Sequence, residues 1–259
     1  MIIAVRDQQK GDAAVEKIKK HYPEAGVSMM MLDLASLKSI KNFAEAFKAK
    51  YEKLDLLINN AGVMMPPHSK TEDDFELQMG TNHFGHFALT GLLLDLMKNT
   101  PGSRIVNVSS SGHNYGKINF DDLNWEKRNY KAMNAYADSK IANLYFTYEL
   151  SRRVEKNGGN PLVTAAHPGW TATELQRHAG VFNFLNRFVA QDITMGALPT
   201  LYAAVGHDVK SGDYYGPAGF REMRGYPKQV DSNALSKDET NAKRLWDVSE
   251  ALTGIKIEM

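Results

Sequence analysis

The hydrophobic pattern alternates along the chain between short apolar runs and longer stretches with helical spacing. Short apolar runs bounded by polar or glycine residues predict buried strands, whereas apolar residues three and four apart predict amphipathic helices. Strands are expected at Met1–Val5, Val27–Leu32, Leu54–Ile58, Arg104–Ser109, Leu162–Ala166 and Tyr214–Tyr215. Helices are expected at Ala13–Lys20, Leu37–Tyr51, Glu72–Lys98, Ala132–Glu155, Ala197–Val205 and Ala242–Leu252. This alternation predicts an α/β fold with a parallel sheet, and without repeats or linkers we expect one domain over residues 1–259.

Composition and charge narrow the class of protein. The 259 residues carry a net charge of +1, which gives no basic surface for nucleic acid. There is no cysteine, so disulfides, thiolate catalysis and cysteine metal sites are excluded. The most apolar stretch, Phe84–Met97, contains His86 and Asp95 and is too short for a membrane span. The first residues lack a signal-peptide layout, so we expect a cytoplasmic protein.

Small, polar or glycine residues follow five of the predicted strands. In open parallel sheets, ligands bind beyond the carboxyl ends of the strands. For any one of these segments, ordinary turn chemistry is a sufficient explanation. All five together favour a nucleotide-binding cleft: Arg6-Asp7, Asp33-Leu34, Asn59–Gly62, Ser109–Ser111 and His167–Thr173.

Tyr136 and Lys140 lie four residues apart in a predicted helix, so their side chains share one face. An ammonium group beside a phenol favours the phenolate, and we expect it to lower the pKa of Tyr136 from its usual value near ~10. Such a phenol can exchange a proton when a carbonyl is reduced or an alcohol is oxidised. A surface tyrosine with a lysine one turn along is the alternative. Of the eleven tyrosines, Tyr136 alone has this spacing to a lysine.

The ordered motifs resemble those of the short-chain dehydrogenases/reductases, in particular the subgroup with retinol dehydrogenases and the WW-domain-containing oxidoreductase. The resemblance runs from Met1 to about the last strand and implies a Rossmann-like doubly wound parallel sheet. Its marks are Asp33-Leu34, NNAG at Asn59–Gly62, Asn82 in TNHFGHF, IVNVSS ending at Ser110, YADSK at Tyr136–Lys140 and HPGWTAT at His167–Thr173.

The resemblance implies an enzyme and assigns its catalytic roles. Tyr136 would be the general acid in reduction and the base in oxidation, and Lys140 would lower its pKa and hold the nicotinamide ribose. Ser110 would hydrogen-bond the substrate oxygen where charge develops. Asn82 would distort its helix and fix a water that links Lys140 to solvent. The substrate would be an alcohol, aldehyde or ketone.

The resemblance also implies an NAD(P) site. Besides Tyr136 and Lys140, its residues would be Asp33 and Leu34 at the adenine, Asn60, Ala61 and Gly62 along the adenosine, and Pro168, Gly169, Thr171 and Thr173 at the nicotinamide. Arg6 follows the position that is usually acidic in NAD enzymes, which favours NADP over NAD. Asp7 would repel the phosphate, unless it is simply a helix-start residue.

The family's glycine-rich turn, which places backbone N–H groups under the pyrophosphate, is absent. Gly212, Gly216 and Gly219 are interrupted by Pro217, and we expect a loop there. The first strand and first helix of the family are thus missing from the chain, and we expect that the true polypeptide, or its ancestor, starts roughly 30 residues upstream. Removal of that central strand would expose two rows of backbone hydrogen-bonding groups.

Three local questions stay open from the sequence alone. Ser109, Ser110 and Ser111 are consecutive, and strand alternation puts Ser110 on the face opposite to the other two. Ser110 is separated from Tyr136 by a long insert that includes GKINFDDLNWEKRNY. The insert forms either a rim over the substrate or a surface loop. Apolar residues could form a lid for a lipophilic substrate or pack against the sheet or a partner subunit: Trp170, Phe182, Phe184, Leu185 and Phe188.

Other functions are weighed against this one. His83 and His86 lie three apart, but no HExxH occurs, so no metal site is expected. No G-x-S-x-G elbow surrounds Ser110, which argues against a hydrolase. A catalytically silent binding or scaffold protein is the alternative that the absent phosphate turn motivates, and an epimerase or dehydratase of the same superfamily is another. The helices Glu72–Lys98 and Ala132–Glu155 correspond to those that pair subunits in homodimers of the family.

Overall fold

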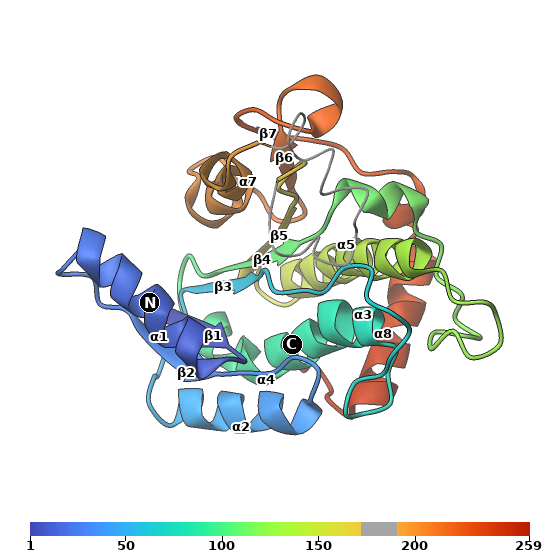
Figure 1. Ribbon diagram of the computed structural model, residues 1–259, viewed down its shortest axis with the longest axis horizontal. Coiled ribbons are helices and arrows are strands. Elements are labelled where there is room, and N and C mark those ends of the chain that lie inside the picture. The colour runs from blue at the N-terminus through green and yellow to red at the C-terminus, as the bar shows by residue number, and fades with distance from the viewer. Residues whose placement is uncertain (172–190) are drawn as a thin grey trace.

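The computed structural model describes residues 1–171 and 191–259, which form an α/β fold of largely parallel strands flanked by helices (Figure 1). The strands are β1 (Ile2–Val5), β2 (Ser28–Met31), β3 (Leu56–Asn59), β4 (Arg104–Val108), β5 (Leu162–Ala166), β6 (Tyr214–Pro217) and β7 (Pro227–Gln229). The helices are α1 (Gln8–His21), α2 (Leu37–Lys48), α3 (Leu77–Met79), α4 (Gly85–Lys98), α5 (Ala132–Lys156), α7 (Ile193–Val205) and α8 (Glu239–Thr253).

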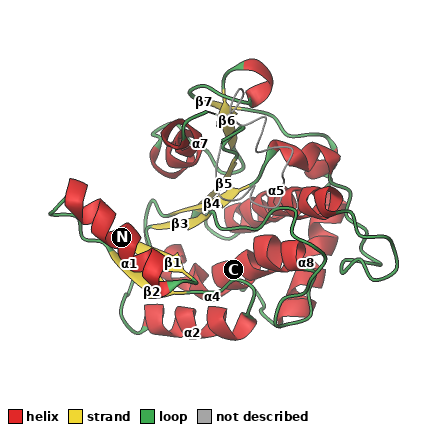
Figure 2. Cartoon of the chain, viewed as in Figure 1, coloured by secondary structure: helices red, strands yellow, loops and turns green. Residues whose placement is uncertain are grey.

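The larger sheet has the order β3-β4-β5-β6-β7, and its strands are parallel except for β7, which runs antiparallel to β6. Successive residues of β4 point to opposite faces, as a pleated strand requires. Ile105 joins the core under α5, whereas Val106 packs with Ala203 and Ala204 of α7. The two helices therefore cover opposite faces, and β4 and β5 lie at the centre of the fold (Figure 2).

Local sequence explains where the helices begin and which face they bury. In α2, Ile40, Phe43, Ala44 and Phe47 form the buried stripe, and Ser36 caps the first turn by accepting from the Ser39 N–H. Caps of the same kind start α1 at Asp7 and α8 at Asp238. Asp7 is thus a helix-start residue.

The predicted elements are confirmed with three exceptions. Glu72–Lys98 is not one helix: Asp74 has a positive φ of 63°, α3 begins only at Leu77, and a π-helical turn over Gly80–Phe84 precedes α4. The predicted loop around Gly216 is wrong, because this residue lies in β6, where a Cβ would collide with the His167 ring. The strand β7 was not predicted, since Pro227–Gln229 has no apolar alternation.

The strands β1 and β2 form a separate parallel pair, which Figure 1 shows in blue below β3. Among the described residues, β1 pairs only with β2, and β3 pairs only with β4. This break lies where the resemblance places the family's first strand. Leu56 and Ile58 of β3 are each 39% exposed, which is unusual for a strand next to the centre of a sheet. One domain over the whole chain stays a prediction.

Candidate active site

Helix α5 is bound to the carboxyl end of β4 through one backbone carbonyl. The Val108 oxygen accepts from Lys140 Nζ at 3.1 Å and from Asn143 Nδ2 at 3.0 Å. The Ser109 hydroxyl returns the contact by donating to the Lys140 carbonyl at 2.8 Å. All of these groups are buried, so an unmade bond here would be costly. The contacts fix the rotation of α5 about its axis and hence the direction of Tyr136.

Tyr136 lies against Ser110, which follows Ser109 just after the end of β4. The Ser110 hydroxyl accepts from the Gly112 N–H at 3.1 Å and forms a hydrogen bond with the Tyr136 hydroxyl. A Cβ on Gly112 would stand 3.4 Å from both Ser110 Oγ and Tyr136 Cε1, so the two side chains meet at this glycine. Ser109 is engaged with α5 and Ser111 is exposed. The structure therefore brings Ser110, and neither neighbour, to Tyr136.

The expected lowering of the Tyr136 pKa is wrong for this structure. Burial raises the pKa of Tyr136 to about 12, although the hydrogen bond with Ser110 acts in the opposite direction. Lys140 Nζ lies 5.6 Å from the centre of the Tyr136 ring, and burial lowers the pKa of Lys140 to about 8. The cost of desolvating a phenolate outweighs the attraction of this ammonium. At neutral pH Tyr136 is a phenol, which is the form that can donate a proton.

Asn82 joins the loop after β3 to α5. It lies in the π-helical turn, so the helix distortion that the resemblance implies is present. Its side chain exchanges two hydrogen bonds with the Val63 backbone, at 2.8 and 2.9 Å, and donates to Ser139 Oγ at 2.9 Å. The Ser139 hydroxyl in turn donates to the Tyr136 carbonyl at 2.7 Å. Asn82 thus holds the strand-end loop and the tyrosine helix together.

Gly62 comes close to Lys140 at this same edge. A Cβ on Gly62 would stand 2.9 Å from Asn82 Oδ1 and 3.8 Å from Lys140 Nζ, so only glycine allows this approach. Asn60 and Ala61, which precede it, are exposed. An ammonium has three N–H donors, and the bond to Val108 uses one of them. The remaining donors suit the hydroxyl groups of a ribose lying along Asn60–Gly62.

The predicted adenosine-side residues lie at the ends of β1 and β2. Arg6 is exposed directly after β1. Asp33 is half-buried, and its Oδ1 accepts from the Ala35 N–H at 2.9 Å, so it also shapes its own turn. Leu34 is buried, and a Cβ on Gly85 would stand 2.5 Å from its carbonyl oxygen. The last contact sets the distance between this strand end and α4.

The strand end after β5 is fixed by close backbone packing. Gly169 has a positive φ of 67°, and a Cβ there would stand 2.5 Å from the Met223 carbonyl. Thr171 is buried, and its hydroxyl donates to the Pro168 carbonyl at 2.9 Å. Thr173 and the predicted lid residues Phe182, Phe184, Leu185 and Phe188 lie outside the described residues.

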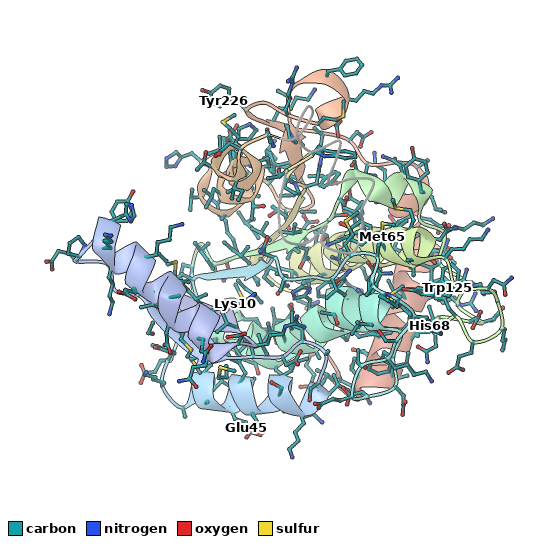
Figure 3. All side chains as sticks on the ribbon, viewed as in Figure 1. Lys10, Glu45, Met65, His68, Trp125 and Tyr226 are labelled. Atoms are coloured by element: carbon teal, nitrogen blue, oxygen red, sulfur yellow. The ribbon has the colours of Figure 1, made fainter. Side chains whose placement is uncertain are left out.

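The insert between Ser110 and Tyr136 packs against α5 and the loop before α3. Asp138 of α5 accepts from the Lys117 N–H at 2.8 Å and lies 3.5 Å from Arg128 Nη2. On the other side, Lys70 pairs with Glu126 at 2.6 Å. Figure 3 shows His68, from the loop before α3, near Trp125 of the insert. These contacts make the insert a brace across α3 and α5 rather than a free surface loop.

Sequence reasoning missed several residues that hold this site. Ser139 lies within the YADSK motif and Asn143 follows Lys140 by three residues, but no role was predicted for either. His86 was considered only as a metal ligand, and no such role was expected. Its Nδ1 lies 3.0 Å from the Asn82 carbonyl, and burial lowers its pKa to about 4, so it is neutral and donates there. His83 is buried and pairs with the Ser249 hydroxyl at 2.8 Å.

Residues 1–171 and 191–259 contain neither a metal-binding cluster nor a helix that could span a membrane. No group of three or more histidine or carboxylate side chains is placed to hold a metal ion. No helix in these ranges has the length and apolarity to cross a membrane.

Comparisons with known proteins agree with the fold and the motifs. Residues 1–181 match the family model described as short chain dehydrogenase. Human retinol dehydrogenase 13 is 42% identical over 267 aligned residues, which cover 99% of this chain and 77% of the human protein. A solved Mycobacterium paratuberculosis protein is 40% identical, with a TM-score of 0.82 over 100% of this chain and 85% of that one.

A more distant structure shares the fold alone. A Shigella flexneri short-chain dehydrogenase, solved in complex with NADP, has 21% identity and a TM-score of 0.54. The match covers 69% of this chain and 70% of that chain.

The burial of Lys140 predicts a pH-dependent stability. Its pKa is about 8 in the folded protein and 10.5 when unperturbed, so between these values the unfolded chain binds more protons. Folding stability should therefore rise with pH in this window. We expect the stability difference between the wild type and Lys140→Met to increase by about 2 kcal/mol from pH 8 to 10, measured by urea unfolding. Lys20→Met, at an exposed position, is the control. If the stability difference between the wild type and Lys140→Met did not change with pH, the lowered pKa of Lys140 would be contradicted.

Proposed function

As a member of the short-chain dehydrogenase family, the chain is an oxidoreductase of CH–OH groups, and we propose that it moves a hydride between NADP(H) and a lipophilic carbonyl or alcohol. The observation that carries this proposal is the meeting of the Ser110 and Tyr136 side chains at Gly112, just after the end of β4, with Lys140 one helical turn away. A hydroxyl that positions oxygen and a phenol that supplies a proton are what carbonyl reduction requires of a protein.

In reduction, both hydroxyl groups act on the carbonyl oxygen of the substrate. Ser110 donates a hydrogen bond that strengthens as the oxygen gains negative charge. Tyr136 donates its proton to that oxygen, and the phenolate that results lies on the same helix face as the Lys140 ammonium. NADPH, when bound, would supply the hydride for the carbonyl carbon. In oxidation the same groups act in reverse, so that Tyr136 accepts the hydroxyl proton.

The residues present fit the nicotinamide half of the cofactor. Gly62 leaves space that a side chain would fill, and Lys140 retains N–H donors beside it. Asn60, Ala61, Pro168, Gly169, Thr171 and Thr173 would line this half, and Asp33 and Leu34 the adenine. Arg6, exposed after β1, is placed to meet the 2′-phosphate of NADP. NADP rather than NAD is therefore our proposal.

The substrate class is inferred from the relatives. Several of the most similar curated proteins are retinol dehydrogenases, from human retinol dehydrogenase 13 to retinol dehydrogenases 11, 12 and 14. Retinol is a long apolar alcohol with one polar end. We infer a substrate of the same kind, in which an apolar body is bound by the protein and the polar end meets Ser110 and Tyr136.

The homodimer remains a prediction, and the structure limits which part of α5 could form its interface. From Ala135 to Ser151, every residue of α5 except Tyr148 is buried, because the sheet, the insert and α8 cover it. A pairing of subunits through this stretch would have little apolar surface left to bury. The silent binding or scaffold protein is kept as the alternative function.

Tyr136→Phe tests the proton donor. Removal of the hydroxyl should abolish nearly all reduction of all-trans-retinaldehyde while NADPH binding changes less than about threefold, because no proton reaches the carbonyl oxygen. The measurements are NADPH consumption and fluorescence titration. Tyr115→Phe, at a tyrosine that is 79% exposed, should behave as the wild type. Near-normal turnover by Tyr136→Phe would show that the assignment is wrong.

Arg6→Ala tests the cofactor preference. Loss of a charge-assisted contact with the 2′-phosphate should weaken NADPH binding by about tenfold or more and leave NADH binding unchanged. Lys20→Ala removes an exposed charge elsewhere and is the control. Equal losses for both nucleotides would refute the role of Arg6. If the wild type binds neither nucleotide, the scaffold alternative is supported instead.

A further inference from the structure

The buried His113 ring contacts the backbone of Ser110. It is only 3% exposed, and its Nδ1 lies 2.7 Å from the Ser110 carbonyl oxygen. The His113 backbone N–H donates to the same oxygen at 3.0 Å. Two donors on one carbonyl close the turn that begins at Ser110. The direction of the Ser110 side chain, which meets Tyr136, therefore depends on this turn.

The far side of the ring faces the segment after β7. The Asn233 backbone N–H donates to His113 Nε2 at 3.4 Å, and the Asn233 side chain donates to the His113 carbonyl at 3.4 Å. Because a backbone N–H can only donate, Nε2 must accept, and the ring proton must lie on Nδ1. This tautomer is the one that can donate to Ser110.

The surrounding groups keep the ring neutral. Burial lowers the pKa of His113, and the neighbouring His167 acts in the same direction. Glu222, which accepts from His167 at 3.1 Å, and the bond to Ser110 act in the opposite direction. The Tyr214 ring stands edge-on to His113 at 5.7 Å and adds no charge. A neutral ring with a fixed tautomer is a better positioning device than one that changes charge near pH 7.

We propose that His113 is a positioning residue of the active site, which sets the direction of the Ser110 hydroxyl by holding the Ser110 carbonyl with its Nδ1–H. The proposal rests on the proposed function for its catalytic consequence. The alternative is that His113 only fills space between β4 and β6. The two roles make different demands on the side chain. Space filling depends on the size of the side chain, whereas positioning depends on a donor at the Nδ1 place.

Two substitutions separate these roles. In His113→Asn, the side-chain amide nitrogen takes the place of Nδ1 and retains the donor, although the residue is smaller than histidine. His113→Leu keeps an apolar bulk and loses the donor. We expect His113→Leu to lower kcat by about 10- to 100-fold with KM and NADPH affinity nearly unchanged, since a displaced hydroxyl weakens the transition state. His113→Asn should stay within about threefold of the wild type. Equal losses in both variants would overturn the proposal.

A double mutant ties the effect to Ser110. If His113 acts through the serine hydroxyl, His113→Leu should cost little further activity once Ser110→Ala is present. Independent, multiplicative losses would overturn the proposal, because a purely structural residue would lower both backgrounds alike.

A third readout needs no turnover and so separates failure of this inference from failure of the proposed function. The ¹³Cζ resonance of Tyr136 in tyrosine-labelled protein at neutral pH, assigned by its loss in Tyr136→Phe, reports its hydrogen bond with Ser110. It should shift in His113→Leu and not in His113→Asn. A wild-type protein without hydride transfer would refute the proposed function alone. An unshifted resonance in His113→Leu would refute the positioning role.

Discussion

The fold and the site both depend on the Val108 carbonyl oxygen, which binds α5 to the end of the central strand. It accepts from Lys140 and Asn143, whose side chains project from the same helix face as Tyr136. A helix that packs on a sheet by apolar contacts alone can slide or rotate at small cost. Buried polar donors with a single acceptor remove that freedom, because a displaced helix would leave them without a partner. Asn82 and Ser139 add a second attachment, so the tyrosine is held from both sides.

Burial shifts the pKa values of both Tyr136 and Lys140. The same desolvation that raises the pKa of Tyr136 lowers the pKa of Lys140, because each prefers its neutral form when water is excluded. Tyr136 is therefore a phenol before the reaction and can donate a proton. The Lys140 ammonium, one helical turn away, is the charge that can stabilise a transient phenolate. The two shifts are two results of one cause, which is burial.

The sequence was sufficient for the parallel α/β order and for the residues that meet at the site. Period-two and period-3.6 patterns located β5 without error and α2 to within its last turn. Spacing paired Lys140 with Tyr136 and the family resemblance added Ser110 and Asn82, and the structure brings these residues together. Three things could not be obtained in this way. The π-helical turn depends on long-range bonds of Asn82, the pKa of Tyr136 depends on burial in the assembled fold, and the contact between His113 and Asn233 joins residues 120 apart. Each arises from tertiary packing, which local pattern does not encode.

The central claim is that the docked α5 places Tyr136 and Ser110 on a carbonyl oxygen while hydride reaches the adjoining carbon. Incubation of the purified protein with all-trans-retinaldehyde and NADPH carrying deuterium at both C4 positions tests this claim most directly. Mass spectrometry of the alcohol formed should show one deuterium per molecule, bound to the carbinol carbon. An alcohol without that label, or no alcohol at a stoichiometric amount of protein, would contradict the account.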